Sequence, residues 1–260
     1  MSSEDVGVTL DGHVAVVEMR RPPNNFVDVD LVAAIATALE RLDEEPRCRA
    51  VVLAAEGKHF CAGGNLKQRL ETEARGEKFV PAARHVYKEA RRLVQTRKPV
   101  IAAVQGAAIG AGLGLAVVAD FRVTCREARF AANFTTIGFA PGFGLTYTLP
   151  RLVGQQQARM MFMTGRRIPG DEAFAMGLAD RLVAQQDLRS EALNLAAELA
   201  GSAPLALQST RATLRRNLVA QLKEAVAHES REQQRHFQTH DFREGVKAMA
   251  ERRQPQFEGR

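Results

Sequence analysis

Hydrophobic and polar residues alternate in two short segments near the beginning of the chain. The segments VTL at 8–10 and VAVVEM at 14–19 approach the period of two that is typical of strands with one buried face. Between them lies the dipeptide Asp11-Gly12, a strong signal for a tight turn. The pattern predicts a β-hairpin.

A helix and a buried strand are expected next. Apolar residues recur every three or four positions across 31–42, and Pro46 follows shortly, so the helix should end near that proline. Asp28 or Asp30 is suitably placed to cap its first turn. The run AVVLAA at 50–55 is short and continuously apolar, as is typical of a parallel strand buried on both faces. Together with the hairpin, these segments predict a β-helix-β unit.

The same order of elements returns later in the chain. A long amphipathic stretch near 78–96 precedes the apolar run PVIAAV at 99–104. A helix rich in glycine and alanine is expected next, followed by the strand FRVTC at 121–125. Such alternation predicts an α/β fold with parallel strands.

The last third of the chain has the pattern of almost continuous helix. From Asp187 onward the helical pattern is broken only at 201–204 and near 239–242. We expect this helical tail to form a second unit. No repeat of fixed period and no low-complexity segment is present.

Composition and charge narrow the possible classes of protein. A chain of 260 residues, 45% hydrophobic and 25% charged, is of ordinary globular composition, which excludes a disordered or fibrous protein. The net charge of +6, with many arginines in the last third, suggests a polyanionic partner, either a phosphorylated small molecule or a nucleic acid. Glu and Asp are interleaved among these arginines, so solvated helix faces explain most of them.

The sequence favours a cytoplasmic protein that does not span a membrane. Residues 1–7 carry two acids and no apolar run, unlike a secretory signal or a basic transit peptide. The segment 100–119 has Gln105 as its one polar side chain, but Ala and Gly dominate it, so we expect a buried strand, turn and helix. The cysteines show no C-x-x-C spacing and predict neither a disulfide framework nor a metal site: Cys48, Cys61 and Cys125.

Two glycine-rich segments are suited to bind a negatively charged oxygen through main-chain N–H groups. In KHFCAGGNL at 58–66, a strand is expected to end at Gly63 and Gly64, and Asn65 is a possible cap of the helix that follows. In QGAAIGAGLGL at 105–115, a new helix would present its first N–H groups, which have no intrahelical acceptors. Each segment alone is weak evidence, because a glycine pair is more often a turn.

Six segments in a fixed order carry a family resemblance. KHFCAGGNL and AAVQGAAIGAGLGLAVVADFRV resemble the first and second signatures of the crotonase (enoyl-CoA hydratase/isomerase) family, and four further segments follow in the family's order: FTTIGFAPGFG, LPRLVG, TGRRIPGDEAFAMGLADRLV and FREGVKAMAERRQPQF. The resemblance covers nearly the whole chain. It implies a crotonase-like α/β spiral of repeated β-β-α units over 1–200, a C-terminal helical trimerisation region over 201–260, and a homotrimer or dimer of trimers.

The resemblance also implies a site for an acyl-CoA thioester. Chemistry beside a thioester builds negative charge on its carbonyl oxygen, and the family would bind that oxygen with the N–H groups of Gly64 and Ala111. Coenzyme A would enter as part of the substrate, so no separate cofactor and no metal are expected. Substrate or CoA contacts are implied for Lys58, His59, Phe60, Ala62, Gly63, Asn65, Leu66 and Gly110.

The acids of the family are missing from this chain. Family hydratases place two glutamates against the substrate, and these positions fall here on Gly114 and Phe134, while a third position, an Asp in certain isomerases and dehalogenases, falls on Gly142. None of these residues titrates, so hydration by the two-glutamate mechanism is disfavoured. Carbonyl polarisation would still support decarboxylation or thioester hydrolysis. His85 and Tyr87, on the helix before the second signature, are the candidate replacement acids.

Structural roles are expected for several other polar residues near the site. We expect Asn133 and Thr136 to satisfy loop backbone, Tyr147 to pack in the core, and Cys61 to be a small buried residue rather than a nucleophile. Phenylalanines suggest an apolar pocket wall or core: Phe134, Phe139 and Phe143.

Three functions follow as alternatives. The first is an acyl-CoA enzyme of unassigned reaction, and the second is an acyl-CoA binding protein without catalysis. The third is RNA binding, which is known for one branch of the family and has only the positive charge in its favour, so a nucleic-acid partner is unlikely.

Overall fold

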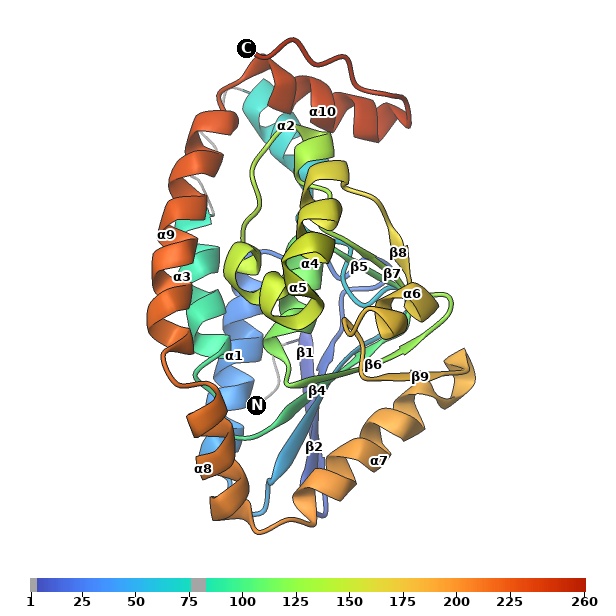
Figure 1. Cartoon of the computed structure of the whole chain (residues 1–260), viewed down its shortest axis with the longest axis vertical. Coiled ribbons are helices and arrows are strands. Elements are labelled where there is room, and N and C mark those ends of the chain that lie inside the picture. Colours follow the sequence, from blue (N-terminus) through green and yellow to red (C-terminus); the bar gives the residue numbers. More distant parts are fainter. Residues whose placement is uncertain (1–3, 76–82) are drawn as a thin grey trace.

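The computed structural model describes residues 4–75 and 83–260. In chain order its elements are β1 (Val6–Asp11), β2 (Val14–Met19), α1 (Val29–Glu44), β3 (Ala50–Ala55), α2 (Leu66–Ala74), α3 (Ala83–Leu93), β4 (Val100–Val104), β5 (Ala107–Ile109), α4 (Ala111–Val118), β6 (Phe121–Cys125), β7 (Arg129–Ala131), η1 (Thr135–Ile137), α5 (Leu145–Thr164), β8 (Ile168–Pro169), α6 (Gly170–Ala175), β9 (Arg181–Val183), η2 (Gln185–Asp187), α7 (Leu188–Ala200), α8 (Pro204–Leu214), α9 (Leu218–His236) and α10 (His240–Glu251). Figure 1 shows helices on several sides of a twisted sheet.

Two sheets form the framework. The larger sheet has the order β1-β2-β3-β4-β6-β9, in which β1 and β2 are the antiparallel hairpin and every later pairing is parallel. The smaller sheet has the order β5-β7-β8. The hairpin, the β-helix-β unit and the parallel order are therefore confirmed. The smaller sheet was not predicted, because the sequence suggested a turn where β5 lies.

Helix α1 shows how local sequence fixes an element. Oδ1 of Asp28 accepts a hydrogen bond from the Leu31 N–H at 2.8 Å, so Asp28, not Asp30, is the cap. At the other end, the buried Lys98 ammonium donates to the carbonyl oxygens of Leu42 and Glu45, where a cation is favourable at a helix C-terminus.

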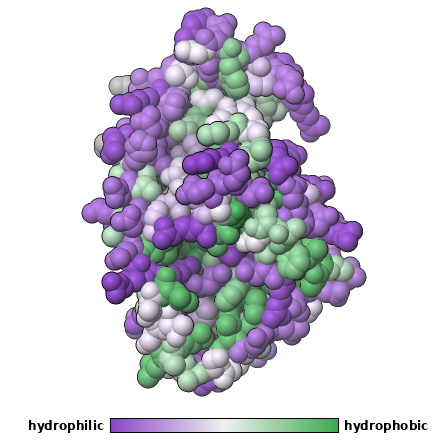
Figure 2. Space-filling model, in the orientation of Figure 1, coloured by the Kyte–Doolittle hydropathy of each residue, from purple (hydrophilic) through white to green (hydrophobic). Residues whose placement is uncertain are grey.

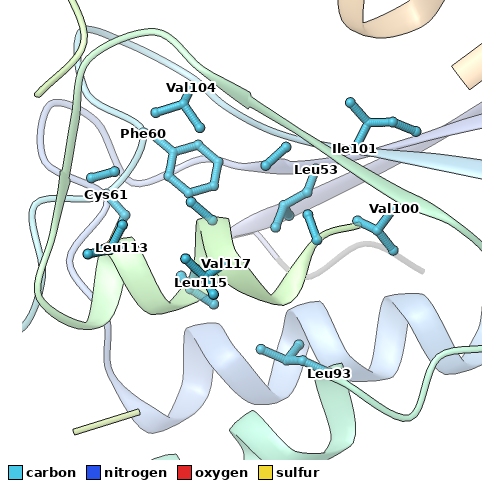
Figure 3. Close-up of a cluster of buried hydrophobic side chains, with 14 of the residues drawn as sticks. Leu53, Phe60, Cys61, Leu93, Val100, Ile101, Val104, Leu113, Leu115 and Val117 are labelled. Carbon is cyan, nitrogen blue, oxygen red and sulfur yellow. The ribbon is translucent and has the colours of Figure 1, made fainter. Parts of the chain in front are cut away.

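The core lies between the larger sheet and the helices packed on it. Strands β3 and β4 are buried almost throughout, as their continuous apolar runs predicted. Figure 3 shows Phe60, Leu113 and Leu115 gathered where α4 passes beneath the strands. The apolar segment 100–119 is thus two short strands and a buried helix. Within residues 4–75 and 83–260, no helix combines the length and apolarity that crossing a membrane would require.

The helical tail is divided between two environments. Helix α7 packs against β3, β4 and β6, so it belongs with the sheet, which corrects the expectation of one separate unit from Asp187. Helix α9 lies beside α3 and α5, and α10 packs against α2 and η1 (Figure 1). A further break, which the sequence analysis missed, occurs at Asn217, where φ is 69°. Whether 201–260 also forms a trimer contact stays a prediction.

Candidate functional site

The two glycine-rich segments lie side by side. Cys61 pairs with Ala108 as a parallel bridge, and the Cys61 N–H donates to the Ala107 carbonyl at 2.8 Å. The Ile109 N–H returns a hydrogen bond to the Cys61 carbonyl at 3.0 Å. Glycine is needed for this approach, because a Cβ atom at Gly112 would lie 2.9 Å from Cβ of Cys61. The segments therefore form one continuous backbone surface.

The residues predicted to supply the two amides meet at one cavity. Gly64 and Ala111 both line it, and within the described chain neither N–H donates a hydrogen bond to protein. Ala111 is the first residue of α4, so its N–H lies at the positive end of that helix. Gly63 adopts φ 91° and Gly110 φ 55°, conformations that favour glycine just before each amide.

The cavity has a volume of about 500 Å³, which falls in the range of small-molecule sites. Its wall is mainly apolar and aromatic, with few polar groups. Helices α1, α2, α3 and α9 contribute to it together with the glycine segments, and it is lined by Val27, Asp28, Val29, Asp30, Ala62, Gly63, Gly64, Asn65, Leu66, Gln68, Thr72, Val86, Tyr87, Ile109, Gly110, Ala111, Asn133, Phe134, Ile137, Phe139, Gly142, Phe143, Gln233, Phe237 and Met249.

Large side chains fill the space beside two of the three positions at which the resemblance implies acids in the family, Gly114 and Gly142. A Cβ atom at Gly114 would lie 2.8 Å from Cγ of Phe143, so the ring of Phe143 takes the space of a side chain there. A Cβ atom at Gly142 would overlap the Tyr87 hydroxyl and the Gln233 amide. Both spaces are therefore already filled.

The third of these positions carries an aromatic ring of its own. Phe134 is 5% exposed, and its ring packs edge-to-face on Phe139 with the centroids 5.4 Å apart. Phe139 in turn contacts Phe237 and Phe242, which belong to the C-terminal helical region. No ionisable side chain stands at any of the three positions, so none of them offers acid or base chemistry.

Tyr87 belongs to a buried polar pair. Its hydroxyl donates to Oε1 of Gln233 at 2.5 Å, and Nε2 of Gln233 donates to the Ala140 carbonyl at 2.9 Å. Burial raises the pKa of the Tyr87 phenol above its usual range, and the negative charge of Glu229 adds to the effect. A phenol with a raised pKa is a weaker acid, which disfavours Tyr87 as a replacement acid. The other candidate, His85, lies in α3, and its side chain is outside the described residues.

The predicted substrate contacts divide into two groups. The structure places five of them in the cavity wall: Ala62, Gly63, Asn65, Leu66 and Gly110. Lys58, His59 and Phe60 are not part of that wall. Phe60 is fully buried in the core (Figure 3), and its contact with substrate stays a prediction. Lys58 is exposed on the surface.

A small basic cluster surrounds His59. Its Nδ1 accepts the Ala107 N–H at 3.3 Å. Burial lowers the pKa of the His59 imidazole, and the positive charges of Lys58 and Arg167 lower it further. Both positive side chains therefore lie near His59, although the sequence gave no signal that Arg167 lies there.

The structural roles predicted for nearby polar residues are largely confirmed. Asn65 accepts the Gln68 N–H at 3.2 Å and caps α2, and the Thr136 hydroxyl donates to the Asn133 carbonyl at 2.9 Å. Cys61 is fully buried, and burial raises its pKa to about 12, so it is a poor nucleophile.

The second tyrosine lies outside the site. Tyr147 is partly buried and does not line the cavity. The Arg151 guanidinium lies 4.3 Å from the centre of its ring.

The sequence analysis missed several groups of the site. Asp30 lines the cavity, and within the described residues its carboxylate has no hydrogen bond or ion pair, whereas Asp28 caps α1 and pairs with Arg21. Gln233, Phe237 and Met249 reach the cavity from the helical tail. In the described part of the chain, no cluster of His, Cys, Asp and Glu is placed to hold a metal ion.

Comparisons with known proteins agree with this arrangement. Residues 9–260 match the family model described as enoyl-CoA hydratase/isomerase. A carnitinyl-CoA dehydratase of Salmonella agona is 32% identical over 263 residues, which cover 99% of this chain and 100% of that protein. An enoyl-CoA isomerase/hydratase of Zymoseptoria tritici is 33% identical over 96% of this chain and 85% of its own. The crystal structure of an enoyl-CoA hydratase/isomerase from Pseudoalteromonas atlantica superposes with a TM-score of 0.86 at 29% identity, covering 98% of this chain and 100% of that one. The chain belongs to the enoyl-CoA hydratase/isomerase family and has the crotonase fold.

Proposed function

We propose that this protein binds an acyl-CoA thioester and polarises its carbonyl group between the N–H groups of Gly64 and Ala111. The observation that carries the proposal is that both residues line one cavity and that neither N–H is paired within the described protein. Two fixed donors, one of them at a helix N-terminus, stabilise negative charge where it develops on a carbonyl oxygen. A ligand oxygen is the partner that these amides lack.

The reaction we propose does not depend on the two family glutamates. In decarboxylation of a malonyl-type thioester, the C–C bond breaks, carbon dioxide leaves, and the electron pair forms an enolate whose oxygen the two amides hold. In thioester hydrolysis, water attacks the same carbonyl carbon and loses a proton while the amides hold the oxyanion. The C–S bond then breaks, and the CoA thiolate leaves and takes up a proton, so that the products are the carboxylic acid and CoA thiol. Asp30, the cavity-lining carboxylate without a partner in the described residues, is our candidate to accept or return a proton.

A second candidate function is acyl-CoA binding without turnover. It is favoured by the large side chains at the family's acid positions: Phe143 fills the space beside Gly114, and Tyr87 and Gln233 fill the space beside Gly142. Loss of acid and base groups removes factors of about a hundred to ten thousand each from the rate of hydration. Product formation decides between the two candidates.

The test is incubation with a mixed library of saturated, 2-enoyl, 3-enoyl, malonyl-type and aromatic CoA esters, read by mass spectrometry for bound ester and product. The decisive variant is Ala111→Pro, which removes the N–H at the first helical position, where proline is well tolerated. Ala111→Gly keeps the N–H and is the matched control. We expect turnover to fall by about a hundredfold or more in the proline variant and to persist in the glycine variant.

The outcomes separate the alternatives. Undiminished binding and turnover by Ala111→Pro would exclude an oxyanion role for this amide. Tight binding with no product from any ester would select the non-catalytic function. Gly64→Pro, compared with Gly64→Ala, repeats the test at the other amide, because a Cβ atom at Gly64 meets nothing within 4 Å.

We also propose that the positive region of Lys58 and Arg167 binds a phosphate group of CoA, and that the chain assembles as a homotrimer or a dimer of trimers. Exposed apolar side chains support assembly, since Met160 and Met163 on α5 are 42% and 74% exposed. Figure 2 shows further hydrophobic surface in the lower half of the face drawn. Light scattering coupled to gel filtration measures the assembly.

The proposed phosphate contact has a separate test. The double variant Lys58→Ala with Arg167→Ala should weaken binding of CoA esters while leaving the assembly intact.

A further inference from the structure

A buried polar pair in the cavity wall retains hydrogen-bonding capacity. Tyr87 on α3 and Gln233 on α9 both line the cavity and are 8% and 3% exposed. They stand where a side chain at Gly142 would project, because a Cβ atom there would lie 3.1 Å from Cζ of Tyr87 and closer still to the two polar ends. A neutral pair thus occupies the position of the family's third acid.

The hydrogen bonds fix the orientation of both side chains. The Tyr87 hydroxyl has one proton, which it donates to Oε1 of Gln233 at 2.5 Å. The Ala140 carbonyl accepts from Gln233 at 2.9 Å, so the amide nitrogen must face that carbonyl. Since Nε2 carries two hydrogens, one N–H of Gln233 is left without an acceptor among the described residues. The Tyr87 oxygen can in addition accept a hydrogen bond through a lone pair.

The pair therefore offers one donor and one acceptor beside Gly142, which also lines the cavity. Val86, Phe139 and Phe143 surround the pair in the cavity wall. A hydrocarbon chain packed here would exclude water and leave both groups unpaired, which is unfavourable in an apolar site. An oxygen on the chain would pair with them. A hydroxyl can accept from Gln233 and donate to Tyr87, whereas a keto oxygen can accept from Gln233.

The charge beside the pair favours a neutral oxygen over a carboxylate. Glu229 lies close enough to raise the pKa of Tyr87, and its own carboxylate accepts hydrogen bonds from Gly144 and Thr146. A buried acidic side chain, Glu229, therefore lies near the pair. A second negative charge on the ligand would be repelled in this weakly screened environment.

We propose that Tyr87 and Gln233 recognise an uncharged oxygen on the acyl chain, and that this protein prefers hydroxyacyl- or ketoacyl-CoA esters to hydrocarbon esters of the same length. The pair is a specificity determinant of the cavity wall, separate from the amides of Gly64 and Ala111. This inference rests on the proposed function, because it assumes that the cavity holds the acyl chain of a CoA ester.

The experiment compares dissociation constants by isothermal titration for a saturated ester and for hydroxy and keto esters of equal chain length, with the oxygen placed at successive carbons. We expect at least one oxygenated ester to bind the wild-type protein about tenfold more tightly than the saturated ester. Tyr87→Phe and Gln233→Leu should reduce this ratio to below about threefold while retaining the saturated ester.

Two matched controls are available in the chain. Tyr147→Phe removes the hydroxyl of the other tyrosine, and Gln234→Leu changes the neighbouring glutamine; neither residue lines the cavity. Both should keep the wild-type ratio. Binding of the saturated ester shows that each variant is folded, and the wild-type ratio tests the inference even if a cavity variant does not fold.

Two failures can be distinguished. Equal wild-type affinity for the saturated ester and for every oxygenated ester would overturn the recognition of an oxygen and leave acyl-CoA binding intact. Absence of binding to any CoA ester, saturated or oxygenated, would overturn the proposed function and this inference with it.

Discussion

Adding one methyl group at Gly114 is expected to destabilise the protein by about 2 kcal/mol, because the space beside this glycine belongs to Phe143. A Cβ atom there would lie 2.8 Å from Cγ and 2.9 Å from Cβ of Phe143. Ordinary carbon contacts are about 3.5–4.0 Å, so the two groups must separate by roughly 0.6 Å or more. Rotating the ring cannot remove the contact with Cβ, whose position the backbone fixes.

The backbone on both sides leaves little room for that movement. Gly114 lies within the buried helix α4, and Phe143 is 4% exposed with φ at 63°. The next residue, Gly144, donates its N–H to the Glu229 carboxylate at 2.7 Å, which holds this turn in place. Overpacking of this kind costs about 1–3 kcal/mol, and the contact with Cβ places Gly114→Ala near the upper end. The better helix propensity of alanine stabilises the fold by about 1 kcal/mol, so the net loss in the free energy of unfolding is about 2 kcal/mol.

Thermal unfolding is the assay, and a loss of 2 kcal/mol corresponds to a fall in Tm of about 4–8 °C for a chain of this size. Gly64→Ala is the control, because its new Cβ atom meets nothing within 4 Å and should change stability by less than about 0.5 kcal/mol. Phe143→Gly removes the opposing Cβ atom, so in the double variant the cost of Gly114→Ala should shrink by about 1–2 kcal/mol. A Gly114→Ala protein as stable as the wild type would refute the reasoning, and with it the claim that a glutamate has no room here.

Three further predictions concern buried ionisable groups. Glu229 accepts hydrogen bonds from the backbone of Gly144 and Thr146, so Glu229→Ala should cost about 1–3 kcal/mol in urea unfolding by leaving both N–H groups unpaired. Burial raises the pKa of Glu229 above its ordinary value of 4.5, so folding favours the protonated form of this side chain. The free energy of unfolding of the wild type, relative to that of Glu229→Gln, should therefore fall as the pH rises from about 4.5 through the higher folded-state pKa. A relative stability that increases over this pH range would contradict the sign. All three cysteines are buried: Cys48, Cys61 and Cys125. A disulfide reagent such as DTNB should therefore modify none of them in the folded protein at pH 7.5 and all three after unfolding. One rapidly reacting thiol would show that the packing around it is open.

Elements with a clear hydrophobic period were predictable from the sequence. The hairpin and α1 combine that period with turn or capping residues, and each lies within a few residues of its predicted place. Strand β3 was predictable as a short, continuously apolar run. Strand β5 was missed because it has three residues, too few to show any period. It pairs with β7, which follows α4 and β6 in the chain, and that pairing depends on tertiary contacts that local sequence does not encode.

The candidate site was predictable only in its main-chain part. Glycine-rich turns before helices are recognisable locally, and the family resemblance implied that Gly64 and Ala111 supply the two amides. The Tyr87–Gln233 hydrogen bond joins residues 146 positions apart, and nothing at either position signals the other. The occupation of the space beside Gly114 by Phe143 is likewise a property of packing, so the sequence could show that an acid was missing and not what had replaced it.

Main-chain and side-chain groups of this site depend on the sequence in different ways. The amides of Gly64 and Ala111 are held by close backbone approach, such as the contact of Gly112 with Cys61, and substitutions at the acid positions leave that approach untouched. Each acid that the resemblance implies for the family would need one ionisable side chain, and Gly114, Phe134 and Gly142 supply none. If the amides hold the carbonyl as we propose, the chain retains stabilisation of an enolate or oxyanion but lacks the paired proton transfer that hydration requires. Decarboxylation keeps its rate under this loss, because the enolate can take its proton from solvent after the C–C bond has broken, whereas hydration needs base and acid while the C–O bond forms.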